Sequence, residues 1–299
     1  MRHDEFQVVT PDGRALEVAT LGDPSGHTVF FHHGTPGSAV MLNMFADVVD
    51  RSGLFFIAMS RPGYGRSSRQ EGRRVVSVVE DVRSVLDTLG RDQYVAVGWS
   101  GGGPHALACG AMDAPRCRAA WSLAGVVPID VDFDWTAGMG PENLEEFALS
   151  LEGGPLYEAH MAEAGDQFSQ ATPDNIVALF GGLLSEVDQT ALADDVARAA
   201  LAAACRHGFA TGYFGFLDDD RVFFSPWGFD VDDIEVPVAV WYGDQDLMVP
   251  PTHGQWLARH LRSVDVRHRP DEGHISIVTN HLEELLGSLR HAFEDSAAS

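Results

Sequence analysis

YVAVGWSGGGPHALA, residues 94–108, joins a strand-like run to a helix-like run through a glycine-rich turn. The first four residues have the apolar pattern of a buried strand, and Pro104–Ala108 has the pattern of the first turns of a helix. Ser100 therefore lies on a sharp strand-to-helix turn, where small neighbours allow the strained backbone that such a turn needs. A G-x-S-x-G pentapeptide in this place predicts a nucleophilic Ser100 hydroxyl. It also predicts a Gly101 amide that can stabilise negative charge.

A serine hydroxyl is a weak nucleophile, so the rest of the chain has to supply a base. His274 follows a strand-like segment at residues 264–267, and Asp246 follows an apolar run at residues 236–242. We predict that Ser100, Asp246 and His274 form a catalytic triad. Their order along the chain differs from that of the trypsin-like and subtilisin-like enzymes.

A fourth motif precedes the serine. A strand-like run at residues 27–32 leads into the turn His33-Gly34-Thr35-Pro36, and we expect the Thr35 amide to pair with the Gly101 amide as an oxyanion hole. This turn resembles the H-G-x-P segment of the α/β-hydrolase superfamily, and the order of the triad is that of the same superfamily. The resemblance covers nearly the whole chain. It is strongest to bacterial esterases and proline-iminopeptidase-like hydrolases that carry a helical cap.

Two of the triad assignments have competitors. The G-x-x-D-x-x-V-P pattern of the family matches Gly243, Asp246, Val249 and Pro250, which leaves Asp244 as a solvated turn residue. His274 alone follows the last strand with a small residue before it. The histidines that compete with it are His32, His33, His105, His253 and His281, of which His33 is interpreted as a structural residue of the oxyanion loop.

Three further residues flank the triad and are candidates for substrate contact: Trp99, Met248 and Ile275. Packing in the protein core is an equally good explanation for each. Acidic residues also begin a predicted helix at 142–151, where they favour the helix dipole. The resemblance to proline iminopeptidases suggests another role, because those enzymes hold the amine of the substrate with carboxylates of the cap.

Strand and helix patterns alternate up to residue 123 and again from residue 236. This alternation predicts an α/β fold with a mainly parallel eight-stranded sheet and helices on both faces. Between these parts there are only helical patterns and loops. We therefore expect an α/β-hydrolase core at residues 1–129 and 234–299 and an inserted helical cap, or lid, at residues 130–233. Aromatic residues concentrate between Phe209 and Phe229, and a few of them should line an apolar pocket above Ser100.

Composition excludes several classes of function. All 20 basic residues are arginine, so a Walker A lysine, a pyridoxal phosphate Schiff base and a lysine-dependent aldolase are excluded. No spacing of cysteine and histidine suggests a metal site, and the chemistry proposed above needs no metal or cofactor. The three cysteines form no C-x-x-C motif, and neither a signal peptide nor a membrane-spanning run is found. We expect a cytoplasmic protein with reduced thiols.

The negative charge is concentrated in one part of the chain. Residues 130–235 contain 22 of the 44 acidic residues and three of the 20 basic residues. Nucleic acid and anionic membranes are therefore poor candidate partners. A solvated acidic surface explains this charge, and attraction of cationic or amine-bearing substrates is the alternative.

Together these patterns predict a serine hydrolase that cleaves an ester, or a related acyl bond, of a small and largely apolar substrate. Serine at the turn argues against epoxide hydrolase and haloalkane dehalogenase activity, because enzymes of those kinds use aspartate there. Three alternatives stay open: a proline-iminopeptidase-like aminopeptidase, a carbon–carbon bond hydrolase, and a ligand-binding or receptor protein on a hydrolase scaffold. The oligomeric state is left open.

Overall fold

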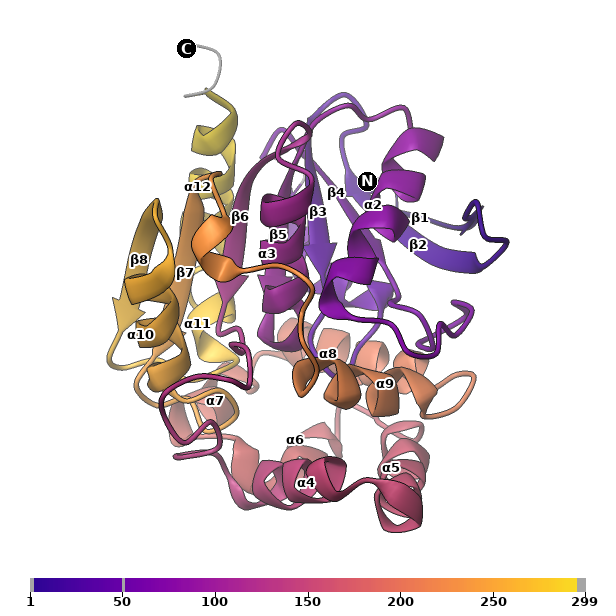
Figure 1. The fold of residues 1–299 in the computed structure, drawn as a ribbon, viewed down its shortest axis with the longest axis vertical. Coiled ribbons are helices and arrows are strands. Elements are labelled where there is room, and N and C mark those ends of the chain that lie inside the picture. The colour runs from indigo at the N-terminus through magenta and orange to yellow at the C-terminus, as the bar shows by residue number, and fades with distance from the viewer. Residues whose placement is uncertain (1–2, 50–51, 295–299) are drawn as a thin grey trace.

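A computed structural model describes residues 3–49 and 52–294 of the chain. The outermost residues of the predicted core, 1–2 and 295–299, lie outside the described residues. Eight strands form one sheet in the order β1-β2-β4-β3-β5-β6-β7-β8 (Figure 1). Their bounds are β1 His3–Val9, β2 Ala15–Gly22, β3 His27–His32, β4 Leu54–Met59, β5 Tyr94–Trp99, β6 Cys117–Leu123, β7 Val238–Gly243 and β8 Val264–Arg269.

The sheet is antiparallel at one edge and parallel elsewhere. Strand β2 runs antiparallel to both β1 and β4, and all pairs from β4–β3 to β7–β8 are parallel. The strands β4, β5 and β7 are buried along their whole length, as expected for parallel strands that are covered on both faces. Strand β8 at the edge is largely exposed and carries Asp265 and Arg267. The predicted fold class is confirmed.

Helices cover both faces of the sheet. Figure 1 shows α2 (Val78–Thr88), α3 (Gly103–Met112) and α10 (Pro251–His260) in front of the strands. The final helix, α12 (Leu282–Glu294), contacts β3, β6 and α1 (Ala46–Val49) on the other face. The remaining short elements of this part are η1 Ala39–Phe45, η2 Val75–Ser77, η3 Ser100–Gly102 and α11 Ser276–Thr279. Among the described residues, no helix combines the length and the apolar character needed to cross a bilayer.

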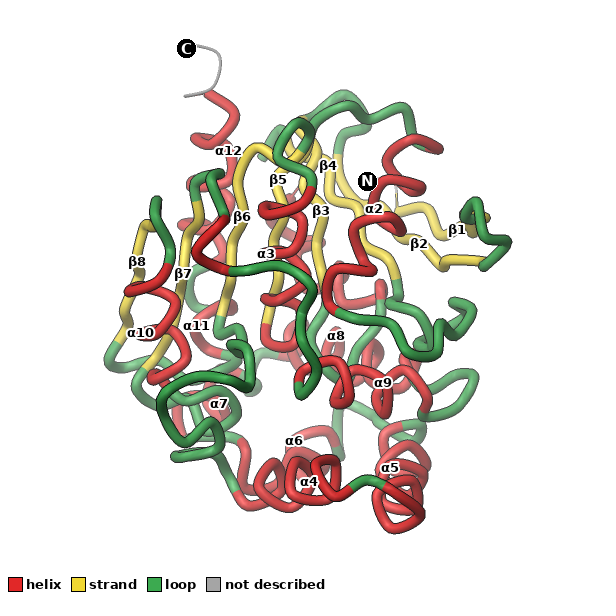
Figure 2. The backbone as a smooth tube through the Cα atoms, viewed as in Figure 1, coloured by secondary structure: helices red, strands yellow, loops and turns green. Residues whose placement is uncertain are grey.

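The chain between β6 and β7 forms six helices, which we call the helical block. They are α4 Pro141–Glu152, α5 Gly154–Phe168, α6 Ile176–Phe180, α7 Glu186–Ala191, α8 Asp195–Gly208 and α9 Phe214–Phe223, with η4 Gly181–Leu183 and η5 Val231–Asp233 as short 3₁₀ turns. Figure 2 shows these helices at one end of the sheet. Helix α8 packs on η1, and a separate apolar cluster joins Tyr64 to α5 and α9.

The acidic residues of the helical block are not all at the surface. Asp188, Asp218, Asp219 and Asp220 are buried. The interpretation of the negative charge as a solvated surface is therefore wrong for these four residues. Burying a carboxylate is unfavourable unless hydrogen-bond donors or cations compensate it, so each of them requires specific partners.

Candidate active site

Ser100 lies at the end of β5 in a strained conformation. Its φ of 58° is in the left-handed region, which costs an L-residue about 1–2 kcal/mol. Close packing explains the first and the last glycine of the pentapeptide, Gly98 and Gly102. A Cβ on Gly98 would lie 2.1 Å from the carbonyl oxygen of Gly102, and a Cβ on Gly102 would lie 2.2 Å from the carbonyl oxygen of His32. The turn thus packs directly against the end of β3.

Asp246 and His274 form a buried pair on the loops that follow β7 and β8. His274 Nδ1 and Asp246 Oδ2 are 2.8 Å apart, and both side chains are almost fully buried. The other oxygen of Asp246 accepts hydrogen bonds from the amides of Met248 and Val249, each at 2.8 Å. The carboxylate is therefore fixed in place, and Nδ1 of His274 can donate its proton to it, which leaves Nε2 as an acceptor.

The environment of His274 favours its protonated form. Burial opposes a charge on the imidazole, but the carboxylates of Asp246 and Asp188 outweigh it and hold the pKa of His274 above its usual value. The loop that carries His274 also contacts the serine turn through Trp99. The indole Nε1 of Trp99 donates a 3.1 Å hydrogen bond to the carbonyl oxygen of His274, and the rings of the two residues stack with centroids 5.9 Å apart.

The competing residues have other partners. Asp244 pairs with His268 at 2.8 Å, and both side chains are exposed. His33 makes the predicted hydrogen bonds around the oxyanion loop. Its Nε2 accepts from the Arg61 amide at 3.0 Å, and its Nδ1 lies 2.7 Å from the carbonyl oxygen of Gly34. Burial and the nearby Arg61 charge lower the pKa of His33 well below its usual value, so this ring is neutral.

Thr35 and Gly101 lie side by side next to Ser100. A Cβ on Gly101 would come within 2.3 Å of Thr35 Oγ1, and a Cβ on Gly34 would lie 3.4 Å from Cβ of Ser100. The structure therefore brings the two predicted oxyanion-hole residues together beside the serine.

A cavity of about 180 Å³ opens at this point, and Thr35, Ser100, Gly101 and Met248 are part of its wall. Trp99 and Ile275, which the sequence suggested as substrate contacts, are not among the lining residues. Both are buried, Trp99 against His274 and Ile275 with its amide bonded to Asp188. Met248 is the member of the three that reaches the cavity.

The helical block supplies most of the other residues of the cavity wall, including several aromatic rings and several carboxyl groups. Aromatic rings come from five positions: Phe147, Phe168, Phe180, Phe216 and Phe223. Carboxyl groups come from four: Glu142, Glu145, Glu146 and Asp220. The cavity is therefore both aromatic and acidic, whereas the sequence predicted an apolar one.

Glu146 and Asp220 form a pair of interacting carboxyl groups at this wall. Asp220 is fully buried, and Tyr157 donates a 3.1 Å hydrogen bond to its Oδ2. Loss of water raises the pKa of Glu146 to about 8, and burial together with the charge of Glu146 raises that of Asp220 well above its usual value. Sequence reasoning missed Asp220, because a run of three aspartates on a helix is typical of a solvated surface. Among the described residues, no group of three His, Cys, Asp or Glu side chains is arranged to hold a metal ion.

Comparison with known proteins agrees with the fold. The family model described as the alpha/beta hydrolase fold matches residues 27–149. An alpha/beta hydrolase fold protein from Nakamurella multipartita is 25% identical, with a TM-score of 0.65, and the match covers 95% of this chain and 99% of that one. The chain therefore has the α/β-hydrolase fold.

Curated relatives of this α/β-hydrolase include two kinds of enzyme. Epoxide hydrolase B of Mycobacterium tuberculosis is 30% identical over 175 residues, which is 56% of this chain. The match spans only 44% of that relative's length. A non-heme chloroperoxidase of Streptomyces lividans is 28% identical over 252 residues, which cover 81% of this chain and 83% of that protein.

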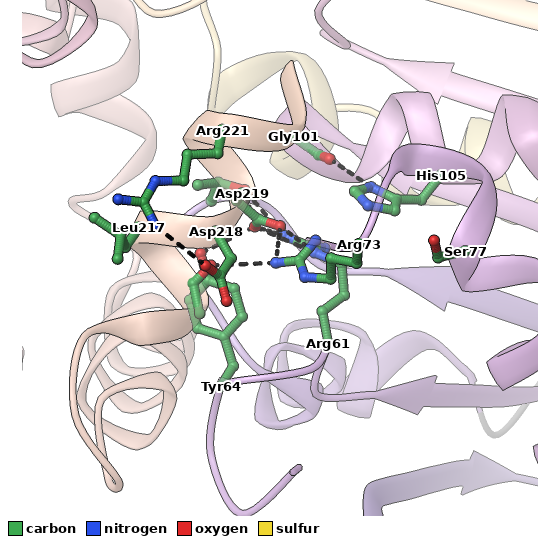
Figure 3. A network of polar contacts seen from close by, with 12 residues as sticks. Arg61, Tyr64, Arg73, Ser77, Gly101, His105, Leu217, Asp218, Asp219 and Arg221 are labelled. Carbon is green, nitrogen blue, oxygen red and sulfur yellow. Dashed lines mark hydrogen bonds and ion pairs between the residues drawn. The ribbon is translucent and has the colours of Figure 1, made fainter. Parts of the chain in front are cut away.

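A buried ionic network supports the oxyanion loop of this α/β-hydrolase. Figure 3 shows Asp219 of α9 directed toward Arg61 and Arg73. Each arginine approaches the carboxylate to 2.7 Å, and all three side chains are buried. Although burial opposes ionisation, the two arginines hold the pKa of Asp219 well below its usual value. The charge of this aspartate is thus compensated inside the protein.

Arg61 also orients the peptide groups of the loop. Its guanidinium donates hydrogen bonds to the carbonyl oxygens of His33 and Gly34 and to Thr35 Oγ1. In a trans peptide the N–H points opposite to the C=O. Because the Gly34 carbonyl faces Arg61, the Thr35 N–H is directed away from Arg61. No sequence pattern predicted this role of Arg61, which lies in the turn after β4.

Replacing Asp219 with asparagine is expected to lower the free energy of unfolding by about 3–5 kcal/mol, because two buried guanidinium groups lose their counter-ion. Glu158→Gln is the control, since its 3.4 Å pair with Arg221 is solvent-exposed, and we expect a change below about 1 kcal/mol. Urea denaturation of both variants measures the difference. Equal destabilisation by the two substitutions would contradict the structural role of Asp219.

Proposed function

We propose that this chain is a serine hydrolase that cleaves a carboxylic ester, or a related acyl bond, of a small and largely apolar substrate. The observation that carries the proposal is the buried His274–Asp246 pair, at 2.8 Å. Its loop contacts Trp99, which directly precedes Ser100 in the strained turn at the cavity wall. A histidine that is held in one tautomer by a carboxylate can activate a neighbouring hydroxyl.

In the proposed mechanism Nε2 of His274 accepts the Ser100 proton while the serine oxygen attacks the substrate carbonyl. The Thr35 and Gly101 amides then stabilise the tetrahedral oxyanion, and one such donor typically contributes about 3 kcal/mol. The intermediate collapses to an acyl-enzyme when the leaving alcohol takes the proton from His274. Water, activated by His274 in the same way, releases the acid and restores Ser100.

The helical insertion at residues 130–233 acts as the cap in this proposal. Its phenylalanine rings supply apolar surface for the acyl group, and burying one methylene contributes about 0.8 kcal/mol. The names of the curated relatives do not decide the reaction. Serine in place of the aspartate expected of epoxide hydrolases argues against transfer of that activity to this chain.

One observation favours a second candidate, an aminopeptidase of the proline-iminopeptidase kind. The Glu146–Asp220 pair lies at the cavity wall, and it carries one negative charge when one of the two carboxyl groups is protonated. Such a pair can hold the free α-amine of a peptide substrate through charge-assisted hydrogen bonds. We favour the ester because aromatic rings contribute more positions to the wall than carboxyl groups do.

A comparison of substrates under one set of conditions tests the two candidates. For p-nitrophenyl esters we expect kcat/KM to rise by up to about fourfold per methylene until the acyl chain fills the cavity. Proline-naphthylamide should be a poor substrate, and acetylation of its amine should not lower kcat/KM further. Efficient cleavage of the free-amine amide, with negligible hydrolysis of the esters and loss of activity on acetylation, would replace the esterase by the aminopeptidase.

A further inference from the structure

Asp188 of α7 is bonded to the loop that carries His274. Its Oδ2 accepts a hydrogen bond from the His274 amide at 3.0 Å, and its Oδ1 accepts from the amides of Ile275 and Ser276 at 2.8 and 2.9 Å. The side chain is fully buried. Ser276 is the first residue of α11, and the first N–H groups of a helix have no partner within the helix. A carboxylate from a distant part of the chain therefore caps the segment that holds the proposed base.

Two neighbours fix the carboxylate in this place. Ser185 Oγ lies 2.9 Å from Asp188 Oδ2 and donates a hydrogen bond to it. Gly273, directly before His274, leaves the space that the carboxylate occupies. A Cβ on Gly273 would lie 2.4 Å from Asp188 Oδ2 and 2.5 Å from Ser185 Oγ. This contact gives a physical reason for the small residue that precedes His274.

We propose that Asp188 is a positioning residue for His274, which fixes the backbone of the histidine loop through three amides and adds a second negative charge near the imidazole. The proposal rests on the proposed function, in which His274 is the general base. The charged groups that act on the ring are Asp246, from the loop after β7, and Asp188, from α7. The neighbouring aromatic ring, Trp99, is neutral.

The inference changes the role of the helical block. Helix α7 belongs to this block and contacts α11, which follows His274 directly (Figure 1). The block therefore reaches the histidine as well as the cavity wall. A shift of α7 would move the histidine loop, because three of the hydrogen bonds that fix this loop end on one carboxylate.

The test variant is Asp188→Asn, which keeps the shape of the side chain and removes its charge. A carboxylate near an imidazole favours the protonated form, so loss of the charge should lower the pKa of His274. His274 accepts a proton only when it is neutral, and the acidic limb of kcat/KM should therefore move to lower pH. We also expect kcat to fall by on the order of 10²-fold, because the loop loses its fixed position.

The matched control is Asp194→Asn. Asp194 also caps a helix of the block, with its side chain accepting from the Ala197 amide at 2.9 Å, but it is exposed and does not contact the histidine loop. Titration of His274 by NMR, with histidine-selective ¹⁵N labelling, reads the pKa without substrate. Wild-type protein that hydrolyses nothing would contradict the proposed function, whereas the NMR shift would still test Asp188.

Hydrogen exchange of the amides of residues 274–276 gives an independent readout. It should become faster in Asp188→Asn and stay unchanged in Asp194→Asn. If Asp188→Asn does not fold, Gly273→Ala displaces the carboxylate without removing its charge, and the same faster exchange and lower kcat are expected. A folded Asp188→Asn with an unchanged pKa of His274 would overturn the proposal. So would a Gly273→Ala variant with unchanged exchange and turnover.

Discussion

Replacing Ser100 with alanine is expected to lower kcat by on the order of 10⁶-fold, because the proposed acyl-enzyme cannot form without the hydroxyl. Alanine differs from serine by one oxygen and has a comparable backbone preference, so the turn should keep its conformation. The residual activity would come from substrate binding and from the Thr35 and Gly101 amides. The loss is measured as the turnover of a p-nitrophenyl ester by a variant whose circular dichroism spectrum matches that of the wild type.

A fluorophosphonate probe gives the second readout of the same prediction. It should label wild-type protein at Ser100 and leave Ser100→Ala unlabelled. Ser84→Ala is the control, since Ser84 lies on α2, does not line the cavity and donates to the carbonyl oxygen of Glu80. This control should be labelled and should turn over substrate like the wild type. Labelling that persists in Ser100→Ala would show that another residue is the nucleophile.

Local patterns were sufficient to predict the fold. The buried runs that form β3, β5 and β7 are continuous and apolar, and each ends in a turn with glycine or proline. Such patterns depend on neighbours in the sequence, which one chain reveals directly. The order of the motifs along the chain then predicted which turns meet, because parallel strands place their carboxyl ends at one edge of the sheet.

The supporting contacts could not be predicted in this way. Asp188 acts on His274 across 86 positions of the chain, and Asp219 contacts Arg61 across 158. Both aspartates occur in helices with other acidic residues, a pattern typical of an exposed helix face. Only the three-dimensional arrangement separates a buried acceptor from a solvated one. The same reason explains why Asp220, the fully buried member of the carboxyl pair at the cavity, was missed.

Proximity in sequence was also a poor guide to the cavity wall. Trp99 and Ile275 are each adjacent to a residue of the predicted triad, but both side chains are buried and neither lines the cavity. Trp99 directs its indole toward His274. Met248, two residues from Asp246, reaches the cavity. Flanking positions are therefore better candidates for support of the triad than for contact with substrate.

The two loops of the proposed active site share one architectural feature. The oxyanion loop is tied through Arg61 to Asp219, and the histidine loop is tied directly to Asp188. Both aspartates come from the helical block between β6 and β7. Part of the acidic excess of this segment thus contacts the loops of the proposed active site, which the composition alone does not reveal.

Replacing Asp246 with asparagine is expected to lower kcat by on the order of 10⁴-fold while the fold is kept. The amide oxygen of asparagine can still accept from the Met248 and Val249 amides, so the turn keeps its hydrogen bonds. Its NH₂ group then faces Nδ1 of His274 and favours the tautomer with the proton on Nε2. In that tautomer the ring cannot accept the Ser100 proton.

Asp244→Asn is the matched control for this substitution. Asp244 lies two positions away on the same turn, and its 2.8 Å contact with His268 is exposed, so kcat should change by less than about twofold. Loss of the Asp246 charge should also lower the pKa of His274, which the NMR titration described above can detect. If Asp244→Asn abolished turnover and Asp246→Asn did not, the buried pair would not be the catalytic one, and the assignment of the acid on this turn would be reversed.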